Sequence, residues 1–144
     1  MSRSNRPEVA MGDVVVVESG EPYRNEVFTH SHTFIADEPV PMGGKNEGPR
    51  PTELLLSALG SCISITLRMY AEHKGIPAGK ITVEVSRDKP VDGEPPQLHV
   101  EIQVEGDLDN AQLKRMRAIA KKCPVHKLLT SNLQISHSLD SVSK

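Results

Sequence analysis

The feature that most constrains this chain is the segment 51–74, which holds the almost unbroken apolar run LLLSALGSCIS at residues 54–64. Pro51 suits a first helical turn, Glu53 complements the positive end of the helix dipole, and Gly75 is a typical C-terminal stop. We therefore predict one long helix over 51–74. Because it is apolar on nearly every side over its first two-thirds, we expect it to be buried on every side. Such a helix runs through the centre of the molecule or into a partner subunit.

Strands are predicted on both sides of this helix. Before it, residues 13–19, 23–30 and 32–37 are rich in β-branched and aromatic residues, and the last two form a hairpin around His30 and Ser31. After it, residues 80–88 and 98–106 alternate strictly between apolar and polar side chains. This alternation predicts antiparallel strands with one face in water.

The rest of the chain adds a loop, two helices and a final strand to the prediction. Residues 38–51 contain four prolines and three glycines, which is typical of a loop, and a long loop in a small domain is often functional. Residues 107–123 form an amphipathic pattern with Asp109 as a plausible N-cap, followed by a short helix in VHKLLTS. With a last strand at 132–139, the element order predicts an α+β fold of antiparallel sheets around a long central buried helix.

Length, charge and composition narrow the function classes. A chain of 144 residues has the length of a single domain, of which residues 1–12 look like a loose N-terminal arm. A net charge of -2 and four aromatic residues argue against a nucleic-acid-binding protein. The N-terminus has no apolar signal region, and hydroxyl residues and Arg68 interrupt the longest apolar stretch, which therefore falls short of a membrane span. We expect a cytoplasmic protein.

The two cysteines, Cys62 and Cys123, are the strongest candidates for chemistry. A lone helical cysteine is usually a packed core thiol, but the side chains around Cys62 are small and leave room for a substrate or a second sulfur. Gly60 costs the helix roughly 1 kcal/mol relative to alanine, which indicates a packing or access requirement. Cys123 follows Lys121 and Lys122, which favour a thiolate, whereas the C-terminal end of a helix dipole opposes it. The charges around Cys123 therefore do not by themselves predict whether it is a thiol or a thiolate.

Other kinds of site have weaker support. His30 and His32 share one face of a strand, and Cys123 and His126 have a spacing that suits metal ligands, but no complete ligand set accompanies them. The glycine-rich stretch 42–48 lacks the frame of a phosphate-binding loop. We predict no metal and no cofactor.

The frame PTELLLSALGSC together with the distant KKCPVH resembles the OsmC/Ohr family, which comprises osmotically inducible protein C and organic hydroperoxide resistance proteins. The resemblance extends over essentially the whole chain and is closest to the shorter OsmC-like branch. It implies one OsmC-like domain over 1–144 and an intertwined homodimer in which the two central helices pack together. It also implies reduction of organic hydroperoxides without metal or flavin, with Cys62 as the peroxidatic nucleophile, Cys123 as the resolving thiol and a dithiol as the reductant.

The family also uses an arginine and a glutamate to activate the thiol, because a neighbouring cation favours the thiolate. Its glutamate stands ten residues before the cysteine, where this chain has Thr52, and Glu53 stands nine before. One residue is a rotation of about 100° on a helix, so the two positions face different ways. Arg24 best fits the expected arginine on an N-terminal strand, and Arg50 is the second candidate.

The sequence therefore predicts a thiol-dependent peroxidase that acts on organic hydroperoxides through a sulfenic acid and then a disulfide. The alternative is a non-catalytic dimer that senses oxidants or binds a small hydrophobic ligand, with the thiols as a switch. The third hypothesis is a pair of inert core thiols.

Overall fold

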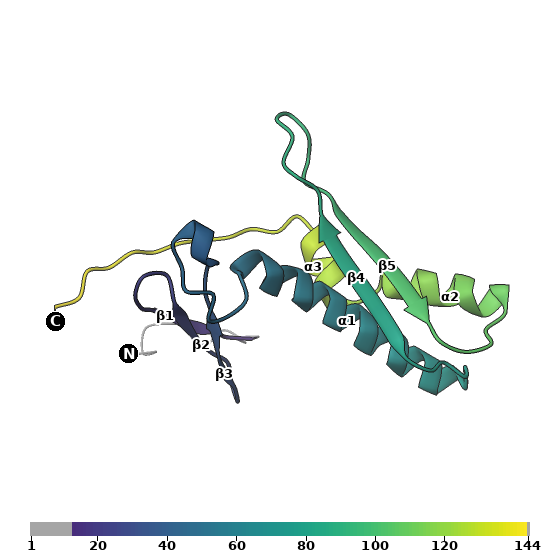
Figure 1. Cartoon of the computed structure of the whole chain (residues 1–144). Coiled ribbons are helices and arrows are strands. Elements are labelled where there is room, and N and C mark those ends of the chain that lie inside the picture. The colour runs from purple at the N-terminus through teal and green to yellow at the C-terminus, as the bar shows by residue number, and fades with distance from the viewer. Residues whose placement is uncertain (1–12, 144) are drawn as a thin grey trace. The chain divides into compact units, whose positions relative to one another are not determined.

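The computed structural model describes residues 13–143, so the loose arm predicted for residues 1–12 lies outside the described residues. Three strands, a long helix, a two-stranded hairpin and two short helices follow one another (Figure 1), which confirms the α+β class. The chain forms two compact units, residues 1–54 and 55–144, and each is described by itself below. That the whole chain is one domain stays a prediction.

The first unit contains a three-stranded antiparallel sheet in the order β1-β2-β3. The strands are β1 (Val16–Ser19), β2 (Asn25–Phe28) and β3 (Thr33–Ala36). Thr29 closes the turn between β2 and β3, since its backbone N–H donates to the carbonyl of His32 at 2.8 Å. The predicted hairpin is confirmed. A single turn of 3-10 helix, η1 (Val40–Met42), interrupts the loop that follows.

The long helix α1 (Pro51–Lys74) has the predicted bounds, and Gly75 ends it with a positive φ of 65°. Its buried residues are spaced four apart and form a single stripe: Leu59, Ile63, Leu67 and Ala71. Away from this stripe, the apolar side chains of Leu55, Ile65 and Met69 are 46%, 60% and 65% exposed. Within the single chain, the elements of the second unit pack on that one stripe alone, so the helix is not buried on every side by its own chain. Burial of its other side by a partner subunit stays a prediction.

The strands β4 (Ile81–Arg87) and β5 (Leu98–Val104) form an antiparallel hairpin that lies along α1 (Figure 1). Val83 pairs with Ile102 on the half-buried face, and the predicted wet face is confirmed by exposed polar pairs such as Glu84 and Glu101. A Cβ added at Gly60 of α1 would lie 3.3 Å from Cγ2 of Val85. The glycine in α1 therefore has a packing reason, which is the close approach of β4.

The helices α2 (Asn110–Ala120) and α3 (Pro124–Thr130) complete the second unit. Asp109 is the N-cap of α2, as predicted: its Oδ1 accepts from the N–H of Gln112 at 2.8 Å, and Oε1 of Gln112 accepts from the N–H of Asp109 at 3.0 Å. This reciprocal capping box satisfies two backbone donors that the helix cannot satisfy itself. Buried Met116 and Ala120 attach α2 to the core.

The last predicted strand, at 132–139, is absent from the described residues, so that prediction is wrong. The side chains that suggested it are open to solvent, with Leu133 50% and Ile135 73% exposed. A strand needs a neighbour for its backbone hydrogen bonds, and no described strand of this chain pairs with the segment. Alternation alone therefore did not make it a strand.

α1 is long and apolar enough to cross a membrane by length and composition alone, contrary to the expectation that the run falls short of a span. The core helix of a soluble protein passes the same test. One stripe of α1 packs against β4, β5 and α2, so this helix contributes to the core of the second unit.

Candidate functional site

The fold brings the two cysteines together in the second unit, although they are 61 positions apart in the sequence. Cys62 is half-buried on α1 and packs against the hydrophobic core, whereas Cys123 is 0% exposed. Their side chains lie close enough for Cys62 to act on the pKa of Cys123 through hydrogen bonding and charge, and both are free thiols. This contact is the condition under which a sulfenic acid on one sulfur can be captured by the other.

The backbone places Cys123 at the start of α3. Its Sγ accepts the N–H of His126 at 3.2 Å, and Pro124 occupies the first helical turn, where a missing N–H costs nothing. The expectation that Cys123 ends the preceding helix, with the dipole opposing a thiolate, is wrong. α2 already ends at Ala120, so Cys123 is instead the N-cap of a new helix.

Burial raises the pKa of the Cys123 thiol above its ordinary value. The backbone N–H groups of His126 and Val125 act against this shift, while the hydrogen bond and the charge of Cys62 add to it. Cys123 therefore keeps its proton and can donate it in a hydrogen bond to the sulfur of Cys62.

The predicted cation and acid belong to the first unit, where both are engaged. Nε of Arg24 lies 2.7 Å from Oε2 of Glu47, and its Nη1 lies 3.4 Å from Oε1 of Glu26. Glu53 accepts the backbone N–H of Arg50 at 3.3 Å, which is a capping contact at the start of α1. The structure thus pairs Arg24 with an acid of the loop after β3.

Arg50, the second candidate arginine, has its own partner in the same unit. Its Nε lies 3.7 Å from Oε2 of Glu38, and both side chains are substantially exposed. A pair with this geometry and exposure is weak. Among the candidate arginines, Arg24 has the shorter contact with an acid.

Sequence reasoning missed Asp37, a buried polar residue of the first unit with 1% exposure. Its carboxylate accepts three backbone N–H groups, from Glu38 at 2.7 Å, Lys45 at 3.2 Å and Glu47 at 3.1 Å. Burial raises its pKa, but these three bonds and the charge of Arg24 outweigh burial and hold the pKa below the ordinary value. The signal in the sequence was an aspartate directly before a Pro- and Gly-rich loop, a position where Asp commonly binds its own backbone.

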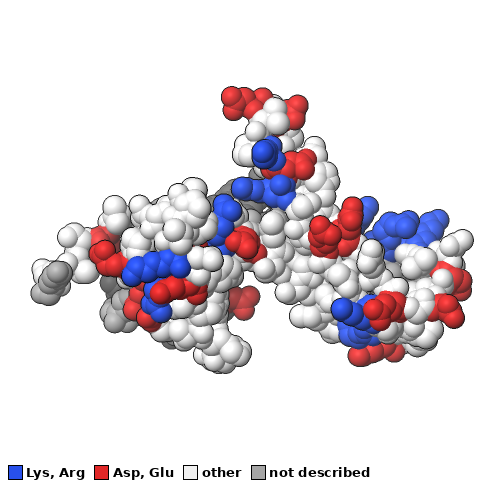
Figure 2. Space-filling model, viewed as in Figure 1, with Lys and Arg blue, Asp and Glu red and all other residues white. Residues whose placement is uncertain are grey.

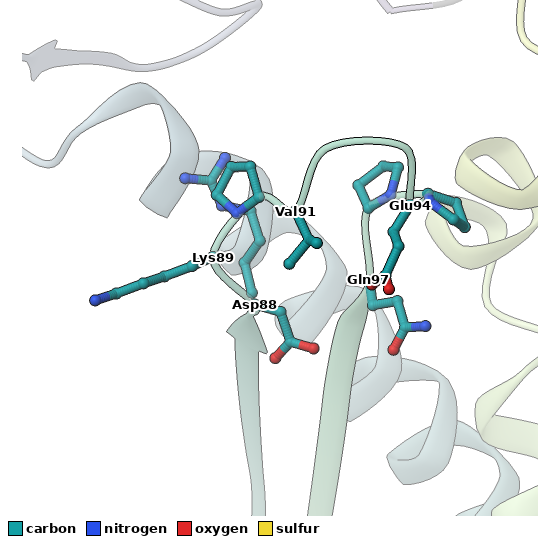
Figure 3. Close-up of a pocket in the computed structure, with 9 residues that line it drawn as sticks. Asp88, Lys89, Val91, Glu94 and Gln97 are labelled. Atoms are coloured by element: carbon teal, nitrogen blue, oxygen red, sulfur yellow. The ribbon is translucent and has the colours of Figure 1, made fainter.

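Two pockets of the second unit lie away from the thiols. The hairpin loop between β4 and β5 borders a pocket of about 230 Å³, with Val91 pointing between its limbs and Lys89 pointing away (Figure 3). A more apolar pocket of about 370 Å³ is bounded by α1, β5 and α2, and its lining residues are Leu67, Val100, Ile102, Val104, Leu113, Met116 and Arg117. Neither cysteine lines either pocket.

Charged side chains of both signs lie on the surface of the described residues (Figure 2). Figure 2 shows acidic and basic side chains interspersed on the visible face. Among residues 13–143, no three histidine, cysteine or acidic side chains are grouped so that they could hold a metal ion.

Comparison with solved structures gives the fold. A Psychrobacter arcticus protein, described as a candidate osmotic stress induced and detoxification response protein, is 28% identical with a TM-score of 0.68, over 78% of this chain and 85% of that one. An OsmC-like protein from Mycoplasma pneumoniae is 22% identical (TM-score 0.67; 86% and 91% covered). The organic hydroperoxide resistance protein OhrB of Bacillus subtilis is 20% identical (TM-score 0.59; 86% and 94% covered). No curated protein matches this chain.

The family model of OsmC-like proteins matches residues 44–138, which is more than half of the chain and includes both cysteines. The chain therefore belongs to the OsmC-like family, as its cysteine frame predicted.

Proposed function

We propose that this protein is a thiol-dependent peroxidase that reduces organic hydroperoxides. The observation that carries the proposal is the contact between Cys62 and Cys123, because a two-cysteine peroxidase needs a second thiol within reach of the first. The similarity to OhrB, an organic hydroperoxide resistance protein, supports the substrate class.

In the proposed reaction, the Cys62 thiolate attacks the distal peroxide oxygen, so an S–O bond forms and the O–O bond breaks. The leaving alkoxide takes a proton and departs as the alcohol, while Cys62 becomes a sulfenic acid. Cys123 then attacks that sulfur, which expels the oxygen as water and forms a disulfide. An external dithiol reduces the disulfide, is itself oxidised, and restores both thiols.

The supporting charges are part of the same proposal. Arg24 is the cation that stabilises the thiolate and the departing oxygen, since a guanidinium lowers the free energy of a neighbouring anion. Arg50 is the alternative cation. Glu53 is the acid candidate on α1 itself, because threonine at position 52 carries no charge.

A homodimer is proposed from the exposed side of α1. Leu55, Ile65 and Met69 lie at spacings that keep them along one side of the helix, and all three are exposed in the single chain. Packing against the same helix of a second copy removes this apolar surface from water. Sedimentation velocity should give a dimer for the natural chain and a monomer for Ile65→Asp, and a monomeric natural chain contradicts this assembly.

We place the protein in the cytoplasm, where dithiol reductants keep thiols reduced.

Steady turnover tests the function. With a dithiol such as dithiothreitol, the natural protein should consume cumene or tert-butyl hydroperoxide over many cycles, and Cys62→Ser should lose this consumption. The serine is nearly isosteric, so circular dichroism can confirm that its fold is intact. Consumption by Cys62→Ser at the natural rate would rule out Cys62 as the nucleophile.

The apolar pocket beside α2 favours the alternative, a non-catalytic dimer that binds a small hydrophobic ligand or senses oxidants. Apolar walls and one arginine at about 370 Å³ suit a small ligand. A sensor or ligand-binding protein does not turn over: it reacts at most once per thiol pair and then stops. The same turnover assay with dithiothreitol therefore separates the two functions.

A further inference from the structure

We propose that Glu47, set in place by Asp37, is the acid that orients Arg24 in this protein. The catalytic meaning of this assignment rests on the proposed peroxidase, but the ion pair and the loop that builds it do not. The position on α1 where the family resemblance places the acid is Thr52 in this chain. Glu47 is an acid from a different element, the loop after β3, that fills the same need.

Arg24 and Glu47 form a close ion pair. Nε of Arg24 and Oε2 of Glu47 are 2.7 Å apart, which is the length of a charge-assisted hydrogen bond, whereas the contact to Glu26 is 3.4 Å. The two side chains are 36% and 48% exposed, so solvent weakens the attraction between their charges. The pair therefore depends on how firmly the backbone holds Glu47 in front of the guanidinium.

The backbone around Glu47 is held by hydrogen bonds to Asp37. Asp37, which is almost fully buried, accepts the N–H of Glu47 itself at 3.1 Å and that of Lys45 at 3.2 Å. The flanking backbone is tied to the same strand end: Asn46 N–H donates to the carbonyl of Glu38 at 3.0 Å, and Asp37 N–H donates to the carbonyl of Pro49 at 3.1 Å. The loop thus folds around one carboxylate and presents Glu47 in a fixed place.

The loop turns at two glycines, Gly44 and Gly48, where a side chain would not fit. A Cβ added at Gly44 would lie 2.8 Å from Oδ1 of Asp37 and would clash with the carbonyl oxygen of Glu38. A Cβ at Gly48 would clash with the carbonyl oxygen of Ile35. The two glycines flank Glu47 and allow the loop to close on Asp37, so the glycine-rich stretch has a role without binding phosphate.

Two other acids of this unit, Glu38 and Glu53, contact Arg50, whereas Glu26 makes the longer contact with Arg24, at 3.4 Å. Glu53 accepts the backbone N–H of Arg50 and so caps α1, and Glu38 lies 3.7 Å from Arg50. Glu38→Gln is therefore a matched control for Glu47→Gln: both change an acid of the same loop that contacts an arginine, but of these two acids only Glu47 contacts Arg24. Asp37→Asn removes the negative charge that gathers the loop and leaves Glu47 unchanged.

Two readouts test the proposal in the full chain. Nitrogen-15 NMR detects the Nε–H proton of Arg24, whose signal is assigned by its loss in Arg24→Lys, and reports the ion pair whether or not the protein is an enzyme. We expect Glu47→Gln to speed exchange of that proton with water by about twofold to fivefold, the range for a partly exposed ion pair, and Asp37→Asn to speed it less. Glu38→Gln should leave it unchanged.

Steady-state kinetics with cumene hydroperoxide give the second readout. Glu47→Gln should lower kcat/KM roughly tenfold to a hundredfold, because a misplaced catalytic group costs about that much, and Glu47→Asp should restore part of the loss. Glu38→Gln should stay within about twofold, as most surface substitutions do. An Arg24 proton unaffected by Glu47→Gln overturns the proposal, and so does a natural kcat/KM in that variant. If the natural protein shows no turnover, the peroxidase proposal fails, and the NMR signal still decides whether Glu47 orients Arg24.

Discussion

The two units of this chain place their candidate site residues by different means. In the second unit an apolar core surrounds the thiols, and its buried members are Leu59, Ile63, Leu67, Ala71, Ile76, Met116, Ala120 and Cys123. In the first unit, Val27 and Ala36 are the buried apolar residues among those described, and a buried carboxylate, Asp37, holds the loop that pairs with Arg24. The thiols are positioned by packing and the arginine by hydrogen bonds.

This difference predicts how a damaging substitution affects each unit. Apolar burial has no direction and sums over many contacts, so damage to the core lowers the free energy of unfolding of the whole unit. Hydrogen bonds are directional, and one missing acceptor leaves several donors unpaired. Damage to the loop should therefore release one segment and leave the core intact.

The largest effect is expected from the core. Leu67→Ala removes a side chain with 1% exposure and should lower the free energy of unfolding by about 2–5 kcal/mol. Leu128, on α3, is 53% exposed, so the same change there should cost far less, about 0.5 kcal/mol. Urea unfolding measures both. Equal losses would contradict the picture of a core on one stripe of α1.

A smaller and more local effect is expected from the loop. Asp37→Ala leaves the N–H groups of Glu38, Lys45 and Glu47 without their acceptor, at a cost of about 1–3 kcal/mol. Hydrogen exchange measured by mass spectrometry should show faster exchange across residues 38–50 and natural protection in α1 and β4. Loss of protection in the core as well would show that the two units are not stabilised separately.

The smallest effect concerns the proton on Cys123. Its folded pKa is raised from 9.0, so the associated stability is present below pH 9 and is lost as pH rises through the folded pKa. Cys62→Ser removes the charge that contributes to this shift and leaves Cys123 as the single thiol. Thiolate absorbance should then show Cys123 ionising at a lower pH than it does in the natural protein. An equal or higher value would mean that burial alone sets the shift.

Sequence reasoning worked where the signal is local. The bounds of α1 follow from Pro51, the apolar run and Gly75, and the N-cap at Asp109 follows from its place at the start of an amphipathic pattern. It failed where a partner is needed. The segment with Leu133 and Ile135 alternates like a strand, but alternation does not supply the neighbour that a strand requires.

The candidate site divides in the same way. Cys62 and Cys123 were found as the two cysteines in a family frame, but their contact across 61 positions is a property of tertiary packing. Asp37 and Glu47 were missed because nothing in the residues themselves tells which backbone groups a carboxylate will gather, or which acid will meet Arg24. Polar partners distant in sequence become visible only when the loop is seen folded.

Mass spectrometry of the thiols after one equivalent of cumene hydroperoxide tests the central claim, that Cys62 and Cys123 form a working pair. For the natural protein we predict a disulfide between Cys62 and Cys123 and no higher oxide, and for Cys123→Ser we predict sulfinic or sulfonic acid on Cys62. In Cys62→Ser, Cys123 should remain an unmodified thiol. Two unmodified thiols in the natural protein, or the same over-oxidation of Cys62 with and without Cys123, would contradict the account.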